Sequence, residues 1–92
     1  MKKDASEIQR LIDELDRDLL REFDADSSDP KYDAEAWRTR ASELFFAMEA
    51  LGEAMTMSET QIREEIPKAR EKEKEDRTRW KARKEAMQWC LS

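Results

Sequence analysis

The stretch EIQRLIDELDRDLLREF, residues 7–23, repeats apolar side chains every three or four positions. The recurring apolar positions are Ile8, Ile12, Leu15, Leu19 and Phe23. An α-helix gathers positions with this spacing on one side and leaves the charged residues between them on the other. Asp4 with Glu7 forms a capping pair ahead of the series. We therefore expect an amphipathic helix over about residues 5–24.

A second helix is expected over about residues 30–55. Asp29 suits the cap of a helix, and Pro30 at the first helical position loses no hydrogen bond. Asp33 offers a later cap. The apolar residues that follow alternate spacings of four and three, as in helices packed in coiled-coil fashion: Trp37, Ala41, Leu44, Met48, Leu51 and Met55. Phe45 and Phe46 lie outside this seam and broaden the apolar face, so we expect a second contact for it.

The third expected helix covers about residues 59–90 and starts at the clearest local signal in the chain. Ser58 and Gln61 form an S-x-x-Q capping box. Pro67 removes a backbone donor, so the helix should kink or end there, and residues 66–68 are a candidate hinge. Residues 68–79 have no apolar stripe and are expected to form a charged, solvent-exposed helical arm.

The composition favours an all-α fold. Only one glycine and two prolines occur among 92 residues, which is too few turn-forming residues for a multi-stranded β protein. Charged residues make up 45% of the chain, and most of the common residue types are good helix formers. We expect one small domain over residues 1–92. It would consist of a hairpin of two antiparallel helices and the long, kinked third helix, in a small bundle or coiled-coil-like arrangement.

The sequence also favours a cytoplasmic location. No run of about 18 apolar residues occurs, as a membrane span requires, and MKKDASEIQR at the start lacks the apolar core of a signal peptide. Cys90 is the single cysteine, so an internal disulfide cannot form, which fits a reducing compartment. We expect no association with a membrane.

The residue types that most enzymes use are scarce. The sequence has no histidine, which removes the commonest general base near neutral pH and the nucleophile systems that depend on it. It also has no glycine-rich phosphate loop, because Gly52 is its only glycine. Cys90 stands near the end of the sequence, where a substrate is difficult to enclose. We expect neither catalysis nor a cofactor.

Residues 24–35 carry oxygen-bearing side chains at intervals that suit calcium. The segment resembles an EF-hand calcium loop, whose positions 1, 3, 5 and 12 are matched by Asp24, Asp26, Ser28 and Glu35. Two positions depart from that pattern, because Asp29 replaces the turn glycine and Lys31 replaces the usual apolar residue. We favour the interpretation of these residues as helix caps and solubilising loop residues, and so expect no metal site.

The net charge of −5 is unevenly distributed along the chain. Residues 1–66 hold 18 of the 23 acidic side chains, whereas residues 67–92 hold 5 acidic and 9 basic ones. Such asymmetry indicates charge-steered association, and a solvated helix surface is the alternative interpretation. The closely spaced carboxylates of residues 4–35 could also imitate the phosphates of DNA and occupy a nucleic-acid-binding enzyme.

The leading hypothesis is a non-enzymatic module that binds a larger protein. Tryptophan and arginine often dominate the binding energy of protein interfaces. Both gather towards the end of the chain, where the candidate partner-binding residues are Trp80, Trp89, Arg77, Arg83, Lys84 and Met87. The partner would be a nucleic-acid-processing or defence protein, inhibited or modulated in the style of small phage proteins. Alternatively, both tryptophans fold back and close a three-helix core.

Two other functions stay open. The first is a self-assembling homodimer with a structural or regulatory role, formed through the broad face of the second helix. Its residues, which are core residues otherwise, are Phe45, Phe46, Trp37, Leu44, Met48 and Leu51. The second is nucleic-acid binding, with the basic end holding phosphates and Trp80 or Trp89 stacking on a base. Interleaved acidic residues make this second function the less favoured one.

Overall fold

The computed structural model describes residues 1–25 and 33–92, and these residues form four helices and no strand. The helices are α1 (Ala5–Ala25), α2 (Ala34–Ala54), α3 (Glu59–Lys72) and α4 (Arg77–Cys90). The all-α prediction is therefore confirmed for this part of the chain. None of these helices combines the length and the apolar character needed to cross a lipid bilayer.

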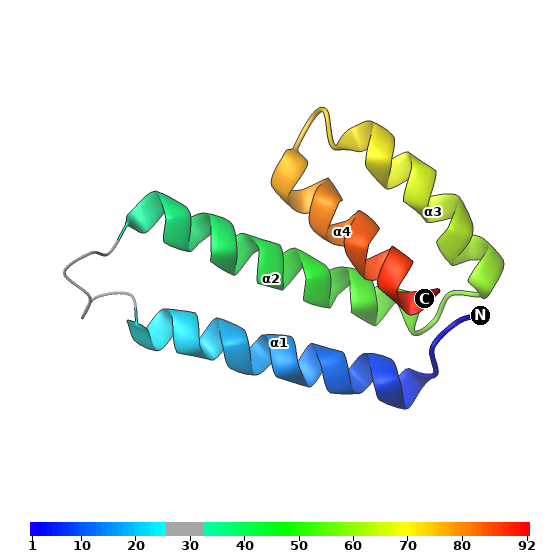
Figure 1. Ribbon diagram of the computed structural model, residues 1–92, viewed down its shortest axis with the longest axis horizontal. Coiled ribbons are helices and arrows are strands. Elements are labelled where there is room, and N and C mark those ends of the chain that lie inside the picture. Colours follow the sequence, from blue (N-terminus) through cyan, green and yellow to red (C-terminus); the bar gives the residue numbers. More distant parts are fainter. Residues whose placement is uncertain (26–32) are drawn as a thin grey trace.

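The helices pack in an order that differs from their order in the sequence (Figure 1). α1 lies antiparallel beside α2, α4 packs on another side of α2, and α3 packs on the outside of α4. α2 and α4 run in the same general direction, and the two ends of the chain lie close together. α2 is thus the central helix, with α1 and α4 as its two neighbours.

Short polar side chains start each helix. The carboxylate of Asp4 accepts a hydrogen bond from the third residue after it at 2.9 Å, and Asp33 caps α2. Ser58 and Gln61 form the predicted capping box at the start of α3, with both of its hydrogen bonds present. At the start of α4, the side chain of Asp76 accepts one hydrogen bond from the backbone amide of Arg79. Each cap satisfies amide groups that have no partner inside the helix.

The structure corrects the prediction of one helix over residues 59–90 with a break near Pro67. α3 continues through Pro67, whose side chain is exposed, and ends at Lys72. Residues 73–76 then form the turn into α4. The predicted exposed arm at 68–79 is accordingly divided between two packed helices, and Ala69 within it is buried. The turn lets α4 fold back on α3 and bury apolar side chains that an extended helix would expose.

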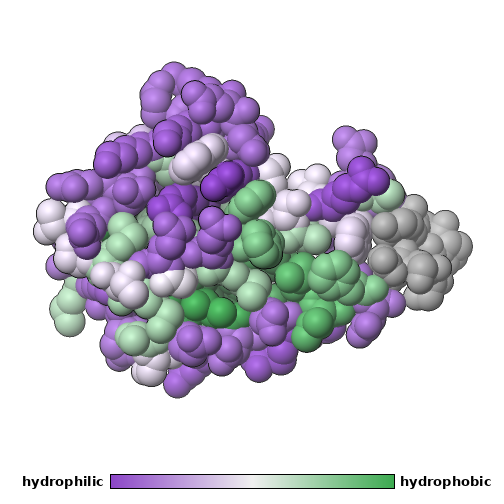
Figure 2. Space-filling view, turned by 180° about the vertical axis from the view of Figure 1, so that it is seen from behind, coloured by the Kyte–Doolittle hydropathy of each residue, from purple (hydrophilic) through white to green (hydrophobic). Residues whose placement is uncertain are grey.

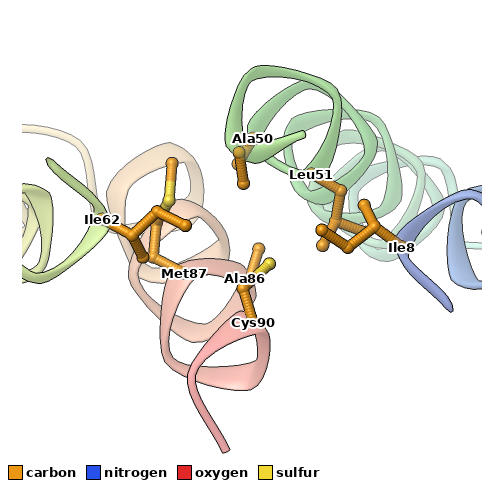
Figure 3. Packing of buried hydrophobic residues seen from close by; sticks show 8 residues of the cluster. Ile8, Ala50, Leu51, Ile62, Ala86, Met87 and Cys90 are labelled. Atoms are coloured by element: carbon orange, nitrogen blue, oxygen red, sulfur yellow. The ribbon is translucent and has the colours of Figure 1, made fainter. Parts of the chain in front are cut away.

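The core is concentrated at one end of the molecule. The large side chains that are fully buried are Ile8, Leu51, Ile62, Met87 and Cys90, and they come from all four helices. Figure 3 shows Ile8 facing Leu51, and Ile62 beside Met87. Burial of each large apolar side chain contributes roughly 1.5–3 kcal/mol. This cluster therefore holds the four helices together.

Polar contacts of the first residues close the same end. The amide of Lys3 donates to the carbonyl of Cys90 at 2.8 Å, and the Lys2 Nζ donates to the carbonyls of Met55 and Met57 at 3.2 and 2.6 Å. The start of α1 is thus tied to the end of α4 and to the α2–α3 connection. At the opposite end of the α1–α2 pair, the rings of Phe23 and Trp37 lie 5.4 Å apart, edge to face.

Candidate protein-binding groove

α1, α2 and α4 together line a groove of about 820 Å³. Leu11 and Leu15 come from α1, Ala47 comes from α2, and Ala82 and Ala86 come from α4. Alanine ends in a single methyl group, so these three residues leave space between α1 and α4 that larger side chains would fill. Figure 2, which shows the molecule from behind relative to Figure 1, has a band of hydrophobic residues between hydrophilic margins on that face.

The groove follows about the same length of each helix. The lining residues lie within 11–22 of α1, 40–51 of α2 and 78–89 of α4. At 1.5 Å per residue, these ranges each extend about 16 Å, or three helical turns. The groove is therefore elongated, a shape that fits an elongated ligand better than a small compact one.

One end of the groove is charged and the other is apolar. At the charged end Asp18 pairs with Arg21, and the Arg40 Nε lies 3.3 Å from Glu22. The first pair lies within α1 and the second joins α1 to α2, while Glu43 of α2 also lines the groove and has no ion-pair partner in the described part of the chain. Towards the other end the lining residues are Leu11, Leu15, Ala47, Leu51, Ala82, Ala86 and Trp89. A ligand can thus bury apolar side chains at this second end without stranding a protein charge there.

Two charges on the α4 side of the groove are unpaired. Lys81 and Glu85 both line the groove and are exposed. Within residues 1–25 and 33–92, neither of them takes part in an ion pair. They lie one helical turn apart along the rim. Both side chains are consequently available to a bound molecule.

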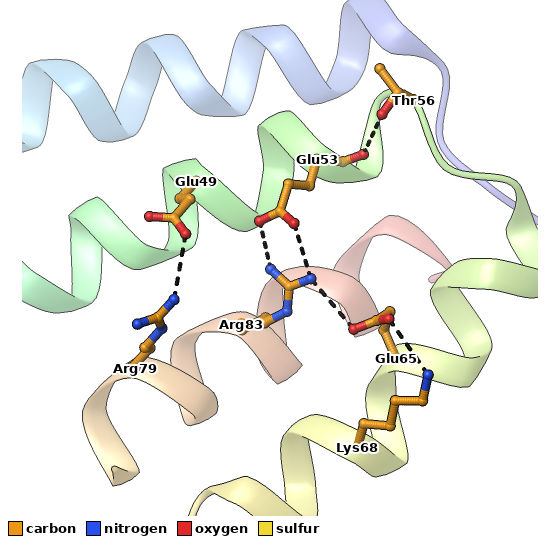
Figure 4. A network of polar contacts seen from close by, with 7 residues as sticks. All are labelled: Glu49, Glu53, Thr56, Glu65, Lys68, Arg79 and Arg83. Carbon is orange, nitrogen blue, oxygen red and sulfur yellow. Dashed lines mark hydrogen bonds and ion pairs between the residues drawn. The ribbon is translucent and has the colours of Figure 1, made fainter.

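Arg79 and Arg83 of α4 form ion pairs with neighbouring helices (Figure 4). Arg83 donates to both carboxylate oxygens of Glu53 at 2.7 and 3.3 Å and to Glu65 at 3.4 Å, which connects α4 to α2 and α3. These hydrogen bonds, those with Glu53 above all, raise the pKa of Arg83 above its ordinary value. Lys84 pairs with Glu73 at 2.8 Å. A partner that bound Arg83 or Lys84 would therefore have to compete with the ion pairs that these residues already form within the chain.

The two tryptophans predicted to bind a partner lie on different sides of α4. Trp89 lines the groove, packs against the core and has the Lys3 ammonium 4.7 Å from its ring centroid. Trp80 is half-buried on the side towards α3, with Lys72 4.6 Å from its ring centroid. Only Trp89 can therefore contact a molecule in the groove.

The structure also corrects the prediction that Met87 contacts a partner. The Met87 side chain is 0% exposed and belongs to the core, because α4 turns this face towards Ile62 of α3. Arg77, by contrast, is exposed at the start of α4. Of the predicted partner-binding residues, the structure therefore places Met87 inside and leaves Arg77 on the surface.

The broad apolar face of α2 packs partly against α1 and α4 and stays partly exposed. Leu51 is buried, and the half-buried residues are Trp37, Leu44, Phe46 and Met48. Arg79 lies 5.5 Å from the centroid of the Phe46 ring, so α4 covers this side of α2. Phe45 stays 55% exposed and does not line the groove. Together with Leu20 and Phe23 of α1, which are 55% and 50% exposed, it forms apolar surface outside the groove.

The structure bears on the calcium loop only in part, because Asp26 and Ser28 lie outside the described residues. Asp24 and Glu35 are exposed at facing ends of α1 and α2. In the part of the chain that the structure describes, no three acidic, cysteine or histidine residues cluster as a metal site would require. Cys90 is buried, and this burial raises the pKa of its thiol. A protonated, enclosed thiol is a poor nucleophile.

The groove was not predicted from the sequence, since three separate segments form it. The signal that was present is the pair Ala82 and Ala86, one turn apart on the face of α4 that lines the groove. Comparison of the chain with protein-family models, with curated proteins and with solved structures found no match.

Proposed function

We propose that this chain is a non-enzymatic protein-binding module that receives part of a larger protein in the groove between α1, α2 and α4. The observation that carries the proposal is a groove of about 820 Å³ with an apolar floor and small side chains along it. Removal of such a surface from water is the main favourable term in protein association. The absence of histidine and the burial of Cys90 support a role in binding over one in catalysis.

Trp89 is the proposed anchor of the interaction. It lines the apolar end of the groove, and its indole combines a large apolar area with a polar N–H group. Because Trp89 also packs against the core, its position is fixed before a partner binds. Lys81 and Glu85 supply charges at the rim, and Arg77 extends this rim at the start of α4. A partly buried aromatic side chain with charged residues farther along the rim is a common arrangement of a binding surface.

The acidic character of α1 favours a partner with a basic surface, such as a nucleic-acid-processing enzyme. α1 carries seven acidic and three basic side chains. An acidic surface attracts a basic partner and raises the rate of association. We propose on this basis that the module modulates or inhibits such a protein, in the style of a small phage product.

A second candidate function is self-assembly through the apolar surface outside the groove. Phe45, Leu20 and Phe23 are at least half exposed, which is uncommon for side chains of this size. A symmetric dimer would cover them with the same surface of a second copy. The two functions use different residues, so one set of variants separates them.

The test compares the wild-type protein with three arginine variants. Ala47→Arg places a long cation across the groove, Ala34→Arg adds the same charge to the exposed start of α2, and Phe45→Arg disrupts the surface outside the groove. Each variant is checked for wild-type helicity by circular dichroism. Tagged proteins are then used for affinity purification from nuclease-treated bacterial lysate, and their mass is measured by light scattering.

The protein-binding proposal expects one captured protein that Ala47→Arg loses and that Ala34→Arg and Phe45→Arg retain. If only the module itself is recovered, as a dimer that Phe45→Arg converts to a monomer, self-assembly replaces the protein-binding proposal. Capture that is indifferent to all three substitutions would show that the groove is not the binding surface. Nucleic-acid binding would instead appear as affinity that falls steeply with added salt.

A further inference from the structure

The dimensions and charges of the groove say more about its occupant. We infer that it binds an amphipathic α-helix of about three turns, with one acidic and one basic side chain a turn apart on the flank that faces α4. This inference rests on the proposed protein-binding function and deepens it by specifying the chemistry of the partner.

The length and walls of the groove favour a helix. Its lining covers about three turns of each of three helices, so an occupant contacts all three along about 16 Å. Packed helices lie with their axes 8–10 Å apart, and a helix laid along this groove would contact α1, α2 and α4. An added β-strand needs a free strand edge, and residues 1–25 and 33–92 contain no strand.

The small side chains of the lining suit the leucines of such a helix. Ala47, Ala82 and Ala86 leave recesses between the larger residues Leu11, Leu15 and Trp89. In packed helices, a large side chain of one helix inserts into a recess formed by residues of its neighbours. Apolar residues at a spacing of three and four would enter these recesses in turn. No charged side chain lines the recesses at the apolar end. Burial of a polar or charged side chain there would therefore be unfavourable, whereas burial of an apolar one would be favourable.

The unpaired charges of α4 define the flank of the occupant. Lys81 and Glu85 line the groove one turn apart and have no ion-pair partner in the described part of the chain. On the α1 side Asp18 pairs with Arg21 and Glu22 pairs with Arg40, whereas Glu43 of α2 also lines the groove and has no ion-pair partner in the described part of the chain. Complementarity therefore calls for an acidic side chain opposite Lys81 and a basic one opposite Glu85. Either direction of the occupying helix can provide this pair.

The experiment uses designed peptides as probes. Each has about 14 residues, because three turns take about 11 and the ends fray. All carry leucines at a spacing of three and four and differ only at two flank positions, which are Glu/Lys, Lys/Lys or Glu/Glu. A fourth peptide carries proline at its centre and cannot form the helix. Binding of the labelled peptides is measured by fluorescence anisotropy at low salt.

Wild-type protein should bind the Glu/Lys peptide about fivefold tighter than either like-charge peptide, the size expected when one exposed ion pair becomes a repulsion. Lys81→Glu should make the Lys/Lys peptide the tightest ligand, and Ala47→Arg should abolish binding of all three. Lys81 is exposed, so its replacement leaves the fold intact.

The other outcomes overturn defined parts of the inference. Equal affinity for the three peptides, with loss in Ala47→Arg, would remove the charge pattern and leave the groove as a helix-binding site. Binding of the proline peptide with unchanged affinity would show that the occupant is not a helix. Failure of every peptide to bind would overturn the inference while capture from lysate still decides the proposed protein-binding function.

Discussion

Replacement of Met87 by alanine distinguishes the core position found in the structure from the surface position expected from the sequence. Met87 is 0% exposed and packs in the cluster that joins the four helices. Truncation of a fully buried methionine to alanine removes its transfer free energy and leaves a cavity, which costs about 2–5 kcal/mol. A chain of this size shifts its melting temperature by about 4–8 °C for each kcal/mol. We therefore expect Met87→Ala to melt at least about 8 °C below the wild type.

The assay is urea and thermal unfolding followed by circular dichroism. Met87→Leu keeps the side-chain volume and should cost less than about 1.5 kcal/mol. Gln88→Ala, at the exposed neighbouring position, should stay within about 0.5 kcal/mol of the wild type. If Met87→Ala unfolded like the wild type but lost binding to a partner, the core assignment and the reasoning from burial would both be refuted.

Four further predictions follow from single contacts. Arg83→Met removes the hydrogen bonds to Glu53 and one of the two cations beside Glu65, and should lower the free energy of unfolding by about 1–3 kcal/mol, measured in urea; an unchanged midpoint would show that the network is only a surface contact. Pro67→Ala restores a backbone donor inside α3 and should raise the melting temperature, whereas a fall would indicate that proline is needed there. Hydrogen bonds from the first turn of α1 lower the pKa of Asp4 in the folded protein. Its carboxylate therefore stabilises the fold above the unfolded pKa of about 3.9, and this stabilisation is lost as the pH falls through the lower, folded pKa. Asp4→Asn should flatten this acid limb of the urea midpoint against pH, and an identical limb would exclude Asp4 as its cause. Burial raises the pKa of Cys90, so iodoacetamide should label its thiol slowly in the native protein and rapidly in urea, as measured by mass spectrometry; equal rates would contradict its burial.

Several local features could be predicted because each depends on neighbours in the sequence. The capping box of Ser58 and Gln61 needs only two side chains three positions apart, and it is present as expected. The apolar spacing of residues 7–23 predicted α1 for the same reason. The break after α3 was placed at Pro67 because proline is the strongest local signal against a helix. The actual turn at residues 73–76 depends on a distant contact, the packing of Met87 on Ile62.

In the candidate site too, residue types could be read from the sequence, whereas the contacts between helices could not. Tryptophan and arginine were selected as binding residues by type, and type does not tell which side of α4 faces its neighbours. Arg83 meets carboxylates of α2 and α3, while Trp89 reaches the groove. A helix wheel drawn without knowledge of the neighbouring helices cannot separate these roles, because each role is set by the helix that faces the side chain.

The amino-acid sequence alone was enough to predict that the described chain is helical, that α1 and α3 begin where they do, and that acidic and basic residues are unequally distributed along it. The first two properties follow from hydrogen bonds and side-chain spacing within a few residues. The return of α4 against α3, the burial of Met87 and the groove between α1, α2 and α4 became visible only once the helices were packed together. The physical reason is that burial of apolar surface is set by contacts between segments far apart in the sequence, and no local pattern encodes which segments meet.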